Sequence, residues 1–77
     1  MAMRRLSLQD ARSAIAAHNE HSYADCELAD YPGGLVLLIG RVSHCGGTDK
    51  TWMGVVEPRD ADALEAEGLA DGWRRAK

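Results

Sequence analysis

The sequence predicts an α+β protein in which a three-stranded antiparallel β-meander carries a helix at each end. Three observations predict it: an unbroken aliphatic run in the middle of the chain, an alternating stretch before it, and helix-boundary signals near both ends. The chain has 77 residues, a length typical of one domain. We therefore expect one small α+β domain over residues 1–77, ordered α-β-β-β-α, with a short basic tail at each end.

The aliphatic run is Leu35-Val36-Leu37-Leu38-Ile39, and Val42 follows after a Gly-Arg pair. A strand with one wet face alternates apolar and polar residues, and this run does not. It is therefore predicted to be the central strand, covered on both faces. A helix is the competing interpretation. It is disfavoured because the run is short and lies between Pro32-Gly33-Gly34 and Gly46-Gly47.

The stretch from Tyr23 to Tyr31 does alternate, which indicates a strand with one wet face. Its inner side would carry Ala24, Cys26 and Leu28, and its outer side Tyr23, Asp25 and Glu27. After the central strand, residues 44–49 are predicted to form a glycine-containing loop. Residues 51–56 are predicted to form the third strand.

Helix signals frame the meander. Ser7-Leu8-Gln9-Asp10 resembles a capping box and predicts a helix from Leu8 to about Asn19. Its inward face would carry Leu8, Ala11, Ile15 and His18. A second helix is predicted to open at Glu57-Pro58 and to end before Gly68, with Leu69 packing back on Leu64 as in a Schellman motif.

Charge is distributed unevenly along the chain. The net charge is -3, and six of the nine basic residues lie near the termini. Between Glu20 and Asp71 there are eleven acidic residues against three basic ones. An acidic body suits a basic protein surface better than a phosphate backbone. The sequence has no apolar run of membrane-spanning length, and its two cysteines lack a secretory context. We therefore expect a cytoplasmic location and no membrane partner.

The predicted element order resembles that of the double-stranded RNA-binding domain. That family contacts phosphates with basic residues at the start of its second helix. Here the corresponding helix carries Asp60, Asp62, Glu65 and Glu67. Phosphate contacts need Lys or Arg, so direct nucleic-acid binding is not expected.

In small size, acidity and lack of a catalytic signature, the chain resembles the compact inhibitor proteins of phages and mobile elements, such as anti-CRISPR proteins. This class resemblance implies a non-enzymatic, stoichiometric inhibitor without a cofactor that docks on a basic nucleic-acid-binding surface of a partner protein. The residues predicted to bind the partner are Asp25, Glu27, Trp52, Asp60, Asp62, Glu65 and Glu67.

Two other hypotheses remain open. The first is a metal-binding or thiol-active domain, because imidazoles and thiolates are zinc ligands and a nearby imidazole activates a thiol. Its candidate residues are His18, His21, Cys26, His44 and Cys45, with His21, His44 and Cys45 expected to lie closest together. The competing structural interpretation makes Cys26 a core residue and His18 a helix-end residue. The second hypothesis is a homodimeric accessory protein that pairs through an edge strand or an open sheet face.

Overall fold

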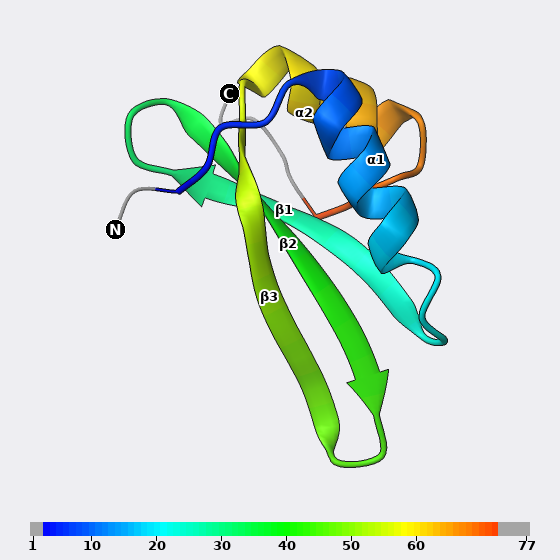
Figure 1. Ribbon diagram of the computed structural model, residues 1–77. Coiled ribbons are helices and arrows are strands. Elements are labelled where there is room, and N and C mark those ends of the chain that lie inside the picture. Colours follow the sequence, from blue (N-terminus) through cyan, green and yellow to red (C-terminus); the bar gives the residue numbers. More distant parts are fainter. Residues whose placement is uncertain (1–2, 73–77) are drawn as a thin grey trace.

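The computed structural model describes residues 3–72 and confirms the predicted α-β-β-β-α order. The elements are α1 (Leu8–His18), β1 (Ala24–Tyr31), β2 (Leu35–His44), β3 (Gly47–Val56) and α2 (Pro58–Ala66). The strands form one antiparallel sheet in the order β1-β2-β3. Figure 1 shows both helices on the same side of the sheet, so the other face of the sheet has no helical layer. The basic tail predicted at the C-terminus, residues 73–77, lies outside the described residues.

Helix α1 begins as its capping signal predicts. The Ser7 hydroxyl oxygen accepts a hydrogen bond from the Asp10 backbone N–H at 3.1 Å. Leu6 before the cap and Ala11 after it are both buried, which is the arrangement of a hydrophobic staple. The helix ends at His18, one residue earlier than predicted.

Helix α2 ends in the predicted Schellman motif. Gly68 has a φ of +75°, a left-handed backbone conformation that residues other than glycine adopt only at a cost in free energy. The Leu69 N–H donates to the Leu64 carbonyl, and the Gly68 N–H donates to the Glu65 carbonyl, both at 3.0 Å. These two bonds satisfy carbonyls that the helix end would otherwise leave unpaired.

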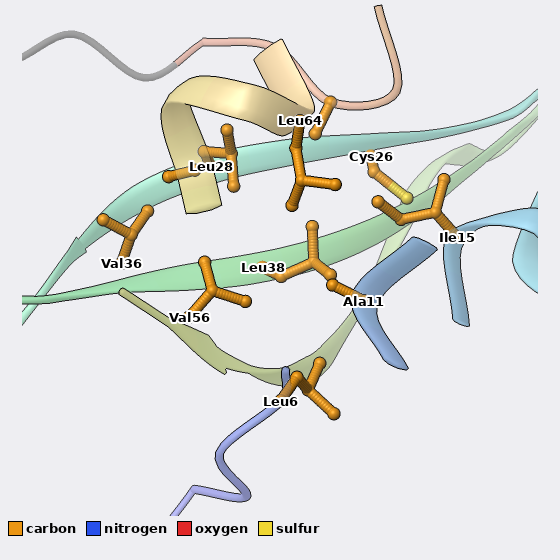
Figure 2. Packing of buried hydrophobic residues seen from close by; sticks show 11 residues of the cluster. Leu6, Ala11, Ile15, Cys26, Leu28, Val36, Leu38, Val56 and Leu64 are labelled. Atoms are coloured by element: carbon orange, nitrogen blue, oxygen red, sulfur yellow. The ribbon is translucent and has the colours of Figure 1, made fainter. Parts of the chain in front are cut away.

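The core lies between the helices and the sheet (Figure 2). Ile15, Leu38 and Leu64 are fully buried, one from each of α1, β2 and α2. The buried cluster is completed by Leu6, Ala11, Cys26, Leu28, Val36, Val56, Ala61 and Ala70. Because this cluster draws on every element, each helix is held chiefly by the apolar area that it covers on the sheet.

Strand β3 contains a β-bulge that the sequence pattern does not reveal. Leu38 lies opposite Gly54, whereas the next residue, Ile39, lies opposite Trp52, so Met53 is an extra residue on β3. An extra residue reverses the side on which the following side chains point. Met53 therefore packs against the core under the helices, and Trp52 lies on the opposite face of the sheet.

The predicted loop over residues 44–49 is too long, and the third strand starts earlier than residue 51. Strand β2 continues to His44 and β3 begins at Gly47, which leaves Cys45 and Gly46 as the turn. The strands here are polar and all exposed from Ser43 to Trp52. Cross-strand backbone pairing holds them without an apolar face, so no hydrophobic pattern marks them in the sequence. We call residues 43–52 the arm; it projects beyond the helices (Figure 1).

Short segments of the chain cover parts of both sheet edges. Beside β1, the Leu28 N–H donates to the Asp71 carbonyl at 2.8 Å and the Asp71 N–H donates to the Cys26 carbonyl at 3.2 Å. Beside β3, Val55 exchanges backbone bonds with Arg4 at 2.8 Å and with Leu6 at 2.9 Å. Arg4 and Arg5, expected in an N-terminal tail, are thus part of the sheet's edge.

Candidate protein-binding surface

We call the sheet face opposite the helices the open face. Its apolar centre is buried even without a helix above it: Leu37 and Ile39 of β2 and Val55 of β3. Partly buried side chains surround this centre, namely Met3, Ala29, Tyr31 and Leu35. The prediction that β2 is a central strand with both faces covered is borne out along its buried stretch, residues 36–40.

Beside this apolar centre, Arg41 organises a group of carboxylates. Its guanidinium donates two hydrogen bonds to Asp25, from Nε to Oδ1 and from Nη2 to Oδ2, both at 2.7 Å. Nη2 also donates to Asp71 Oδ1 at 3.3 Å, and Nη1 lies 3.9 Å from Glu27 Oε2. The bonds to Asp25 and the neighbouring carboxylates raise the pKa of Arg41.

The same group includes Lys50 on β3, whose Nζ lies 3.0 Å from Glu27 Oε1. Three carboxylates thus share two cations, so the group carries a net charge of -1. The ion pairs hold the carboxylates in fixed positions on a rigid sheet. That lowers the side-chain entropy lost when a partner binds them.

Trp52 lies on the open face at the base of the arm. It is opposite Ile39 in the β2–β3 register and is 63% exposed. The other large exposed aromatic residue of residues 3–72 is Tyr23, at 83%. Tyr23 precedes β1 and has a φ of +60°, so it is turned out of the regular strand. Tryptophan is among the residue types that most often dominate interface energy.

The predicted partner-binding residues fall into two groups on opposite sides of the sheet. Asp25, Glu27 and Trp52 come together on the open face. The other four belong to α2, which covers the other face: Asp60, Asp62 and Glu65 lie on the helix, and Glu67 is its C-cap residue.

Part of the α2 charge is already neutralised. Arg12 donates to both carboxylate oxygens of Glu67, at 2.9 and 2.6 Å, and this lowers the pKa of Glu67. Arg5 lies 3.5 Å from Glu57 at the start of the helix. The α2 surface is therefore less negative than its sequence indicates.

The candidate metal residues are spread over different parts of the molecule. His18 Nε2 is 2.9 Å from the Arg41 carbonyl oxygen, and the His18 and His21 rings meet edge to face at 6.4 Å. Cys26 is buried, and burial raises the pKa of its thiol to about 11, which fits its structural interpretation as a core residue. His44 and Cys45 lie at the arm's turn. Over residues 3–72, no group of three or more His, Cys, Asp or Glu side chains is placed to hold a metal ion.

The thiol-active hypothesis rests on Cys45, which is exposed beside a surface hollow of about 270 Å³ lined by Tyr23, Ser43, His44 and Cys45. The neighbouring imidazole is already engaged at both nitrogens. His44 Nδ1 accepts the Gly46 N–H at 3.1 Å, and Nε2 lies 3.2 Å from Asp49 Oδ2. General-base activation of a thiol requires a free imidazole nitrogen that can accept the thiol proton. In this arrangement His44 has no such nitrogen for Cys45.

The ion group around Arg41 was not predicted from the sequence. Alternation placed Asp25 and Glu27 on one side of β1, but nothing in the sequence links either to Asp71, which joins the group through its pairing with β1. No protein-family model matches this chain, and no curated protein and no solved structure match it. Neither helix within residues 3–72 is both long and apolar enough to cross a membrane.

Proposed function

We propose that this protein is a non-enzymatic, stoichiometric inhibitor that docks through its open face on a basic, nucleic-acid-binding surface of a partner protein. The observation that carries the proposal is that an exposed Trp52 lies on the same sheet face as the carboxylates of Asp25 and Glu27, with Ile39 between Trp52 and Glu27 in the register.

The chemistry of this face fits a surface rich in arginine and lysine. An arginine of the partner can stack on the exposed indole of Trp52, a cation–π contact worth about 0.5–1 kcal/mol where it is solvent-exposed. The carboxylates on the same face provide acceptors for guanidinium and ammonium donors. The net charge of -3 speeds the approach of a positively charged partner.

The position of α2 allows the two acidic surfaces to be tested separately. Because α2 and the open face lie on opposite sides of the sheet, one flat partner surface can meet only one of them. The carboxylates of both surfaces are partly compensated, by Arg41 and Lys50 on the open face and by Arg5 and Arg12 at α2. The open face differs in having an exposed aromatic anchor, Trp52.

The experiment uses the tagged full chain to capture its partner from cells that harbour it, and then measures the partner's nucleic-acid binding in a purified system. We expect Trp52→Ala to weaken capture by about tenfold or more, as removal of an interface anchor does. Tyr23→Ala is the matched control, because it removes an exposed aromatic side chain elsewhere. The triple reversal Asp60→Lys, Asp62→Lys and Glu65→Lys tests the α2 surface.

The proposal requires that an equimolar amount of the wild-type protein displaces nucleic acid from the captured partner. It would be overturned by a partner that keeps its nucleic acid in the presence of excess protein. If Trp52→Ala captures the partner as well as wild type does and the α2 reversal does not, the docking surface is α2 and the open-face assignment is wrong.

A further inference from the structure

We propose that two copies of this chain pair through the outer edges of their β3 strands, antiparallel about a two-fold axis at Lys50, to form a continuous six-stranded sheet. This inference goes beyond the proposed function and does not depend on it.

Within residues 3–72, much of the outer edge of β3 has no strand beside it. Backbone bonds from Arg4 and Leu6 occupy the outer edge of β3 at Val55. Within residues 3–72, no backbone hydrogen bond reaches the outer edge of the stretch from Gly47 to Met53. An edge of this length presents a row of unpaired N–H and C=O groups, which is a template for another strand.

Among the described residues, the arm packs against no other layer of the fold. All its residues are exposed, and no helix covers either of its faces (Figure 1). A two-stranded ribbon is marginally stable in water, whereas three or more strands sustain a sheet. Pairing two arms would give each one additional neighbouring strand.

The strand that we expect to pair with this edge is the same edge of a second copy. The edge of β1 is bonded to Asp71, and the end of β3 is bonded to the N-terminal segment, so the arm's outer edge is the long free one in the described chain. Pairing between copies then joins the same edge to itself, which closes a dimer instead of a fibre. The arm holds one Asp and one Lys, so these two side chains leave it without a net charge, whereas the whole chain carries -3.

The register follows from the length of the free edge. Full overlap of residues 47–53 with their copies places the axis at the midpoint, Lys50. Thr48 then lies opposite Trp52 of the second copy, a β-branched and aromatic pair that stabilises sheets. On the other face of the sheet, Asp49 lies opposite Thr51 of the second copy. The two Lys50 side chains meet at the axis, and each has Glu27 Oε1 at 3.0 Å to offset their repulsion.

Sedimentation equilibrium of the purified full chain, from about 10 μM to 1 mM, tests the proposal, because strand-edge interfaces of this size belong to the weak class. Thr51→Glu places a carboxylate opposite Asp49 of the second copy, and we expect it to raise the dimer dissociation constant about two- to thirtyfold. Thr51→Arg places a cation there and should lower the constant. Ser13→Glu and Ser13→Arg make the same charge changes at an exposed site on α1. These two control variants should leave the dimer dissociation constant unchanged.

A chain that sediments as a monomer up to 1 mM overturns the proposal. So does a dimer whose dissociation constant responds equally to Thr51→Glu and Thr51→Arg. Circular dichroism confirms that each variant is folded, since Thr51 is exposed and no core contact is lost. These measurements contain no partner protein, so their outcome is independent of the capture experiment.

Discussion

At the scale of single residues, Gly40 is a point of close approach between β2 and α1. A Cβ atom at this position would lie 2.9 Å from His18 Cε1 and 3.0 Å from Met53 Sδ. The missing side chain leaves room for the His18 ring, whose Nε2 reaches the Arg41 carbonyl oxygen at 2.9 Å. The glycine in the aliphatic run therefore serves helix packing, and the predicted inward position of His18 on α1 is confirmed.

We expect Gly40→Ala to lower the free energy of unfolding by about 1–3 kcal/mol, because a methyl group must displace the His18 ring or the Met53 sulfur. Urea denaturation measures the change. His18→Ala in the same background removes the clash, so the double variant should lose less stability than the two single losses added together. Additive losses would show that the ring and the methyl group do not compete for the same space.

At the scale of elements, α2 shows how a local signal specifies a boundary. Gly68 adopts its left-handed conformation in open space, since a Cβ atom added there would meet no neighbouring atom within 4 Å. The requirement for glycine here is thus a property of the backbone and not of packing. For this reason sequence reasoning could place the end of the helix correctly without knowing its neighbours.

Replacing Gly68 isolates that backbone cost. We expect Gly68→Ala to lower the free energy of unfolding by about 1–2 kcal/mol, the cost of a left-handed conformation for an L-residue with a Cβ. Gly68→Asn should cost less, because asparagine tolerates this conformation better. Thermal and urea unfolding should rank the proteins by stability, with Gly68 the most stable, the asparagine variant next and the alanine variant the least stable. Equal stabilities for the alanine and asparagine variants would contradict it.

Other features at this scale depend on contacts that no local pattern encodes. Capping and Schellman signals lie within a few residues, so the boundaries of both helices were predictable. The bulge at Met53 is different, because it is stabilised by what lies across the sheet, including the room beside Gly40. Without it, Trp52 would point toward the helices. Asp25, Glu27 and Trp52 were all predicted to bind the partner, but the bulge that puts Trp52 on the same face as the two carboxylates is a feature of tertiary structure.

At the scale of the whole molecule, burial is unevenly distributed along β2 and β3. Residues 36–39 of β2 are buried between the two apolar clusters, whereas the far half of the same strand enters the exposed arm. The arm lengthens the molecule, whose extents are 35 × 27 × 22 Å. Local opening takes little free energy where few apolar contacts are lost, so the arm can open while the root of the sheet stays folded.

Amide hydrogen exchange should reveal this gradient. In dilute solution we expect amides of residues 43–52 to exchange at least about tenfold faster than those of residues 36–39, since arm opening exposes no core residue. Raising the protein concentration toward 1 mM should slow exchange in the arm, most of all in residues 47–53, because a second β3 strand would then bond their outward N–H groups. The amides of α1 provide the internal control, since they lie away from that edge. Uniform protection along β2 and β3 in dilute solution would mean that arm and root open together, and the arm would then need no second copy for its stability.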